Sequence, residues 1–163
     1  MEVRLAPCST ADKDFVFRVT EAAMRSYVEE AFGSWEADAQ RRRSEASFDL
    51  ATYRLVVVDD VRAGILVVED RSSEVFLGKI FLLPEFQKRG IGTVLIRQLI
   101  ERAAMERKPL RLRVLRVNAG ARRLYERLGF VVTHSTADHH YLEQHSDSGK
   151  QGIDVGADAL RRD

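Results

Sequence analysis

A chain of 163 residues with 45% apolar residues suits one globular domain with an ordinary core. Its formal net charge of +1 provides no field that favours nucleic acid or an anionic membrane, and no apolar stretch approaches the roughly 20 residues of a membrane span. The single cysteine, Cys8, excludes an internal disulfide, and the N-terminus lacks a signal-peptide core, so a cytoplasmic protein is expected.

The hydrophobic pattern predicts a single domain of helices and strands over residues 1–143. Helices are expected where apolar residues recur every three to four positions, and strands where β-branched runs lie between turn residues. In chain order these are a strand at 3–6, helices at 12–31 and 35–48, strands at 53–58, 63–69 and 74–83, a helix at 93–107, a strand at 110–117, a helix at 119–128 and strands at 130–136 and 139–143. The order β-α-α-β-β-β-α-β-α-β-β predicts an α+β fold (mixed α/β) with helices on both faces of a central sheet. Residues 144–163 are rich in Ser, Gly and Asp and are expected to form a disordered tail.

One segment, Gln87-Lys88-Arg89-Gly90-Ile91-Gly92, lies between the apolar run that ends at Pro84 and the helix predicted at 93–107. A turn here collects free N–H groups from Gln87 to Thr93 at the positive end of a helix dipole, which suits a phosphate or pyrophosphate. Its two glycines leave room for an anion beside the backbone. The segment is neither a Walker A loop nor a full dinucleotide motif, since Leu95 stands where the third glycine belongs.

A second motif lies one helix and one strand downstream. It places a polar residue, a small residue, an aromatic residue and a Gly-Phe pair at fixed spacing, at Asn118, Ala121, Tyr125, Gly129 and Phe130. Together with the first motif's Gln87, Gly90 and Gly92, this pattern resembles the GNAT superfamily of acyl-CoA-dependent N-acyltransferases, most strongly over residues 76–132. The resemblance implies a mixed, largely antiparallel sheet and an enzyme that moves an acetyl group from acetyl-CoA to a primary amine of a small molecule or a peptide.

The resemblance also implies roles for single residues. The acetyl-CoA pyrophosphate would bind the turn formed by Gln87, Lys88, Arg89, Gly90, Ile91, Gly92 and Thr93. The backbone of Leu82 and Leu83 would hydrogen-bond the pantetheine arm, and Asn118 would contact it. Tyr125 occupies the position of the general acid that protonates the leaving thiolate, and direct attack by the amine needs no acyl-enzyme. The acceptor wall comes from the first two helices and the final hairpin, which contain Tyr27, Trp35 and His139.

The general base is not evident from the sequence. Many relatives carry a glutamate six residues before the proline, where this chain has Gly78. Glu29, Glu30 or Tyr27 could act through water, although each also suits an ordinary surface or capping role. An amine that arrives with a low pKa would need little help.

Alternatives remain open at this point. Lys88 and Arg89 also suit a solvated turn, Asn118 a helix cap, Tyr125 a core position and Trp35 simple packing. A GNAT-fold protein that binds acyl-CoA without turnover, or a phosphate binder unrelated to CoA, would share the glycine turn. The four histidines lack metal-ligand spacing, so no metal site is expected. The identity of the acceptor and the oligomeric state, a homodimer included, are not determined by these patterns.

Overall fold

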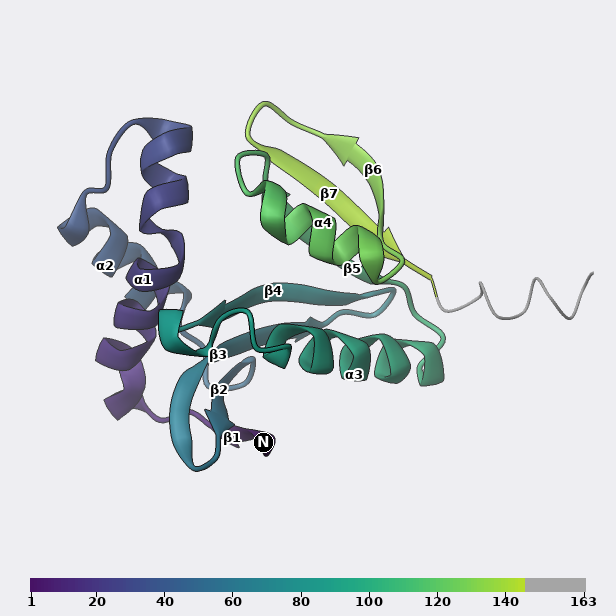
Figure 1. Cartoon of the computed structure of the whole chain (residues 1–163), viewed down its shortest axis with the longest axis horizontal. Coiled ribbons are helices and arrows are strands. Elements are labelled where there is room, and N and C mark those ends of the chain that lie inside the picture. The colour runs from purple at the N-terminus through teal and green to yellow at the C-terminus, as the bar shows by residue number, and fades with distance from the viewer. Residues whose placement is uncertain (146–163) are drawn as a thin grey trace, which may run out of the picture.

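The computed structural model describes residues 1–145 and contains every helix and strand that the sequence predicts (Figure 1). The elements are β1 (Val3–Pro7), α1 (Lys13–Phe32), α2 (Ala37–Ser47), β2 (Tyr53–Val58), β3 (Val61–Asp70), β4 (Val75–Leu82), α3 (Ile91–Met105), β5 (Leu110–Leu115), α4 (Ala119–Arg127), β6 (Val131–Ser135) and β7 (His139–Gln144). Single 3-10 turns precede α1 and follow β4. The tail predicted at 144–163 lies outside the described residues, except that Gln144 ends β7 and His145 follows it.

The seven strands form one sheet in the order β1-β2-β3-β4-β5-β7-β6. Every neighbouring pair is antiparallel except β4 and β5, which are parallel because the chain crosses over between them through α3. The mixed, largely antiparallel α+β fold is therefore confirmed.

Helices cover both faces of the sheet, as the sequence predicts. Alternate side chains of β2 enter two separate cores, because successive residues of a strand point to opposite faces. Leu55 and Val57 pack against α1, whereas Val56 and Val58 belong to the core that α3 and α4 cover. Burial of apolar side chains on both faces explains why β2 is a continuous apolar run rather than an alternating one.

Two helix starts differ from the predicted ones by two residues. The second helix begins at Ala37 rather than at 35, because Trp35 is held outside it. Its indole N–H donates to Glu21 of α1 at 2.9 Å and its ring stacks on Phe17. The third helix begins at Ile91, two residues earlier than predicted, because Gly90 adopts a left-handed conformation (φ 80°) that starts the helix directly after it.

The sheet opens between β4 and β5. These strands pair only over Val75–Leu77 and Leu110–Leu112, and beyond this point β4 stays with β3 while β5 stays with β7 (Figure 1). Gly78 is the extra residue of a β-bulge in β4, since Leu77 and Lys79 pair with adjacent residues of β3. A bulge bends its strand and increases its twist, so the divergence begins where the bulge lies.

Candidate functional site

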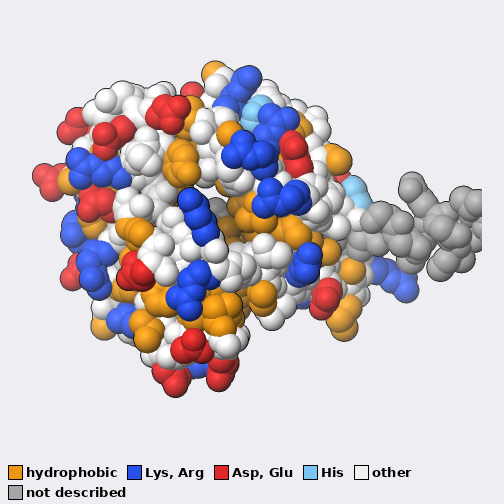
Figure 2. All heavy atoms as spheres, in the orientation of Figure 1, with side chains coloured by type: hydrophobic (Ala, Val, Ile, Leu, Met, Phe, Trp, Pro, Cys, Tyr) orange, Lys and Arg blue, Asp and Glu red, His pale blue; other side chains and the backbone are white. Residues whose placement is uncertain are grey.

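A cavity of about 500 Å³ lies where β4 and β5 diverge. Its walls come from α1, α2, β4, β5, α3, α4 and the start of β7, so it reaches from one helix layer to the other through the open part of the sheet. Figure 2 shows a hollow in this face, with Lys or Arg side chains at its rim. The shape is that of a site which could receive two substrates from opposite sides of the sheet.

The glycine turn presents an uncapped helix end to this cavity. The first intrahelical bond of α3 runs from the Val94 N–H to the Gly90 carbonyl at 3.1 Å, so the N–H groups of Ile91, Gly92 and Thr93 have no acceptor within the helix. No side chain of the described residues caps them. A Cβ built on Gly92 would meet only Ile80, at 3.9 Å, so the space beside this residue is open to a ligand. The turn is therefore suited to an anion, as the sequence predicts.

The side chains of the turn have more local roles. Gln87 lines the cavity, and its Nε2 donates to the Leu82 carbonyl at 2.9 Å, which ties the turn to the end of β4. The Gln87 backbone N–H is also engaged, with the Pro84 carbonyl at 3.2 Å. Arg89 lies over the Phe86 ring, 5.4 Å from its centroid. These contacts hold the shape of the turn, and its backbone is left to receive a ligand.

Leu82 supplies the backbone donor that faces the opening. The N–H of Leu83 donates to Ala63 of β3 at 2.8 Å, and its carbonyl accepts from the Phe86 N–H at 2.9 Å. Because alternate residues of an antiparallel strand turn their backbone groups to opposite sides, the N–H of Leu82 points away from β3 and into the gap beside β5. The backbone of Leu83 is thus occupied within the fold, and Leu82 alone of the two offers its N–H to a ligand.

Asn118 and Tyr125 reach the cavity from the α4 side. The Asn118 Oδ1 accepts the Ala121 N–H at 3.1 Å, so this residue caps α4, and its side-chain amide NH₂ has no hydrogen-bond partner within residues 1–145. Tyr125 is 8% exposed, and its ring lies 5.6 Å from that of Phe130. Its hydroxyl has no hydrogen-bond partner within residues 1–145, and burial raises its pKa to about 12. The hydroxyl therefore stays protonated and can donate to a ligand.

The opposite side of the cavity carries the candidate acceptor residues. Tyr27 of α1 and His139 of β7 line it, as the sequence predicts. Trp35 does not line it, because its indole is 9% exposed and docks on α1 through Glu21. Arg43, Lys79 and Arg113 also line this side. Arg43 belongs to the run Arg41-Arg42-Arg43, which in the sequence suits a solvated helix face better than a grip on an acidic substrate or on the cofactor's 3′-phosphate. Lys79 and Arg113 carry no signal in the sequence beyond positive charge, which they share with many surface residues.

A comparison with protein families identifies the chain. The model of the acetyltransferase (GNAT) family matches residues 20–130, a segment that includes the turn, the β4–β5 opening and Tyr125. The chain belongs to this family. It is an acetyltransferase of the acyltransferase class, and the family implies an acceptor substrate.

Solved structures share the fold of this GNAT acetyltransferase. PaiA N-acetyltransferase from Thermoplasma acidophilum in complex with coenzyme A aligns with a TM-score of 0.72 and 18% identity, over 89% of this chain and 99% of that one. An acetyltransferase from Thermus thermophilus gives 0.70 and 16%, over 89% and 97%. The ribosomal-protein-S18-alanine N-acetyltransferase from Escherichia coli gives 0.67 and 20%, over 88% and 94%. At these identities the likeness establishes the fold.

The described residues of this GNAT acetyltransferase place no carboxylate in the cavity wall. Among the described residues that line it, none is Asp or Glu. Of the bases considered from the sequence, Glu29 pairs with Arg25 on α1 at 2.7 Å, and neither Glu29 nor Glu30 lines the cavity. At the family's glutamate position, a Cβ on Gly78 would meet only Val67, at 3.4 Å or more, so steric exclusion does not explain the glycine. Within residues 1–145 the cavity wall therefore offers no carboxylate that could serve as a base.

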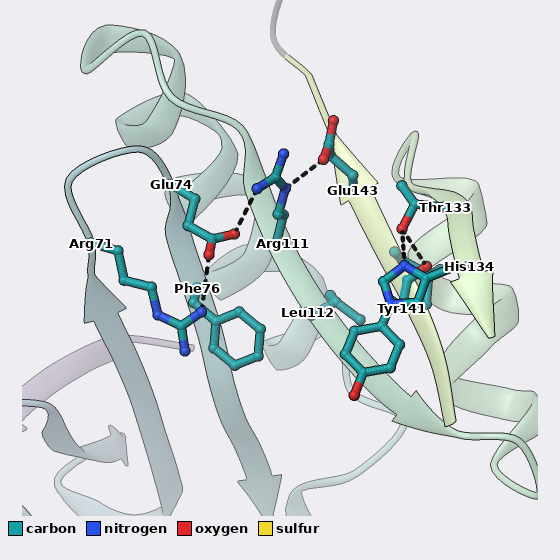
Figure 3. A pocket seen from close by; sticks show the side chains of 10 residues that line it. Arg71, Glu74, Phe76, Arg111, Leu112, Thr133, His134, Tyr141 and Glu143 are labelled. Atoms are coloured by element: carbon teal, nitrogen blue, oxygen red, sulfur yellow. Dashed lines mark hydrogen bonds and ion pairs between the residues drawn. The ribbon is translucent and has the colours of Figure 1, made fainter. Parts of the chain in front are cut away.

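A second cavity, of about 410 Å³, lies at the closed end of the β4–β5 opening. Figure 3 shows its charged side chains directed at one another: Arg111 pairs with both Glu74 and Glu143, and Arg71 pairs with Glu74. This network joins β5 to the start of β4 and to β7. Each of these charged side chains has a partner. The ion-pair network of the second cavity is therefore interpreted as structural: it keeps the strands paired where the opening begins.

Residues 1–145 contain no helix long and apolar enough to cross a bilayer. The same residues contain no cluster of three or more His, Cys, Asp or Glu side chains that could hold a metal ion.

Proposed function

We propose that this protein transfers an acetyl group from acetyl-CoA to a primary amine by direct attack. The observation that carries the proposal is the uncapped N-terminus of α3 and the Tyr125 hydroxyl facing one cavity at the β4–β5 opening. Acetyl-CoA carries a pyrophosphate, which needs an anion site, and a thioester, whose leaving sulfur needs a hydrogen-bond donor. The cavity offers both. The coenzyme A bound to PaiA N-acetyltransferase supports the same co-substrate.

In this proposal the chain binds acetyl-CoA mainly through backbone groups. The N–H groups of Ile91, Gly92 and Thr93 receive the pyrophosphate at the positive end of the α3 dipole. The Leu82 N–H receives the thioester carbonyl, where it stabilises the negative charge that forms on oxygen during attack. The amide of Asn118 contacts the pantetheine arm from the α4 side.

The chemistry needs one bond made and one broken. A neutral amine entering from the α1 side attacks the thioester carbon, a C–N bond forms, and the C–S bond breaks. The Tyr125 hydroxyl donates to the departing sulfur, and the nitrogen loses its proton to solvent. No residue of the chain is acylated, so Cys8, which packs beside the α1 core, has no part in it.

A non-catalytic acyl-CoA-binding protein is the second candidate, because the cavity wall, as far as the described residues form it, lacks a carboxylate base. The two candidates differ in turnover alone. Release of free thiol from acetyl-CoA in the presence of an amine supports the enzyme. Tight binding of acetyl-CoA without thiol release across a broad amine panel supports the non-catalytic acyl-CoA-binding protein.

Thermal-shift titration tests the co-substrate directly. Acetyl-CoA at about 100 times its Kd should add about 2.7 kcal/mol of stability, or roughly 5–10 °C of Tm for a domain of this size. Adenosine diphosphate is the control anion. An equal shift of Tm with both ligands would favour a phosphate binder unrelated to CoA. No shift with either ligand would exclude the site.

A pair of variants tests the turn. Gly92 and Gly120 both occupy the second position of their helix, and neither has a Cβ clash, since the nearest atoms lie at 3.9 and 4.0 Å. Gly92→Asp should abolish acetyl-CoA binding, because it places a carboxylate at the phosphates. Gly120→Asp should fold and bind like the wild type. Normal binding by a folded Gly92→Asp protein would remove the turn from the site.

A further inference from the structure

The acceptor side of the main cavity is cationic. Arg43 from α2, Lys79 from β4 and Arg113 from β5 line it together with His139 from β7. Tyr27 and Tyr125 are the other titratable groups of the wall, and none of the described lining residues is acidic. The three positive charges, of Arg43, Lys79 and Arg113, come from three different elements, so they surround the space rather than mark one face of one helix.

These charges are not neutralised by neighbouring carboxylates. Arg43 and Arg113 form no ion pair within residues 1–145. The Lys79 ammonium donates to the hydroxyls of Tyr53 at 2.9 Å and Ser47 at 3.2 Å, which fix its position and leave its charge in place. Arg111 in the second cavity is the contrast, since glutamates of two strands pair with it.

Such a wall acts in opposite ways on two kinds of acceptor. A polyamine would bring further positive charge beside the arginines, and like charges repel one another. An amine with an anionic group would bind through charge-assisted hydrogen bonds to a guanidinium, which is shaped to hold a carboxylate with two parallel bonds.

The same wall also acts on the proton of the acceptor amine. Like charges nearby disfavour an ammonium, so they favour the neutral amine that attacks the thioester. His139 is consistent with this environment: burial, and then the charge of Arg113, lower the pKa of its imidazole, although the neighbouring Asp138 acts in the opposite direction. A cationic wall therefore supplies part of what the missing carboxylate base would supply.

Resting on the proposed function, we propose that the acceptor is a small amine that carries an anionic group, bound by Arg43 and Arg113, and that the cationic wall keeps its amine neutral for attack. A free amino acid is the simplest compound with this chemistry. The cavity size favours a small molecule, because about 500 Å³ must also hold the thioester end of the co-substrate.

Matched acceptors test the proposal. Amino acids are compared with their own carboxamides, which differ in charge but hardly in shape, and with 1,4-diaminobutane as a dication. Binding of each is measured by calorimetry on the full chain with coenzyme A bound, which needs no turnover, and kcat/KM is measured by thiol release. We expect roughly a tenfold or greater preference for the acid over its amide, and weaker binding of the diamine.

Charge-removing variants connect the preference to the wall. Arg113→Gln and Arg43→Gln should each reduce the acid-over-amide ratio several-fold and leave acetyl-CoA affinity unchanged. Arg97→Gln, which removes the same charge from an exposed position of α3 outside the cavity, should change neither. In Arg113→Gln the rising limb of the kcat–pH profile should move to higher pH, because the ammonium is then less disfavoured.

The outcomes separate this proposal from the function on which it rests. Suppose that acetyl-CoA binds, but that the amide or the diamine binds as tightly as the acid, or that no acid binds. The acceptor proposal is then wrong and the acetyl-CoA site stands. An acid preference that survives both arginine substitutions also overturns it. If acetyl-CoA itself does not bind, the proposed function fails first.

Discussion

Substitution of Tyr125 by Phe isolates one hydroxyl group. The ring is buried against Phe130, and the hydroxyl has no partner within residues 1–145, so its loss should leave the fold intact. Acetyl-CoA affinity should also change little, because the pyrophosphate site lies on another helix. The effect is expected in the chemical step alone.

The size of the effect follows from two acidities. Burial raises the pKa of Tyr125 to about 12, whereas a thiol titrates near 8.5, so complete proton transfer to the leaving sulfur is uphill by about 4.8 kcal/mol. Tyr125 is therefore expected to donate a hydrogen bond rather than to release its proton. A hydrogen bond to a charged group contributes about 1.5–3 kcal/mol, which corresponds to a loss of roughly 10- to 150-fold in rate.

Single-turnover thiol release with saturating amine measures this step without product release. Tyr141→Phe is the control, because it removes the same group from the second cavity. A change of less than about twofold would show that the Tyr125 hydroxyl does not contact the leaving sulfur. A loss near 10⁴-fold, the upper range for general acid catalysis, would refute the hydrogen-bond argument and indicate full proton transfer.

Three further predictions concern the cap of α4, one glycine each of β3 and β4, and alkaline pH. Asn118→Asp should keep the cap on the Ala121 N–H, so the stability of the protein in urea should not change. It should weaken acetyl-CoA binding in calorimetry, because the amide donor is lost. Asn118→Ala should weaken binding and also lose about 1 kcal/mol of stability. Gly64→Ala should destabilise the protein by about 1–3 kcal/mol in urea, because its Cβ would overlap a β4 carbonyl oxygen, while Gly78→Ala should have little effect. Between pH 10 and 12 the Tyr125 side chain ionises in the unfolded chain but not in the folded one, so the folded state loses stability as pH rises. Tyr125→Phe should lose up to about 2.7 kcal/mol less than the wild type over this range, as measured by denaturation at each pH.

Local pattern was sufficient for the elements, and it carries the prediction of the co-substrate half of the site. The turn from Gln87 to Gly92 and the aromatic at 125 are read along one strand–helix–strand–helix segment, where neighbours in the sequence are also neighbours in space. The strong helix periods and β-branched runs predicted element type in every case, and no boundary moved by more than two residues. The two helix starts that moved by two residues have tertiary or conformational causes: an indole docked on α1, and a left-handed glycine that starts a helix.

Only the tertiary structure decided which residues share the proposed acceptor side of the cavity. Arg43, Lys79, Arg113 and His139 are far apart in the chain, and in the sequence Lys79 and Arg113 resemble ordinary surface residues. The short β4–β5 ladder and the bulge at Gly78 open the sheet and bring these side chains to one space. Charge in a sequence is a property of single residues, whereas the field in a cavity depends on which charges share it and which carboxylates are absent.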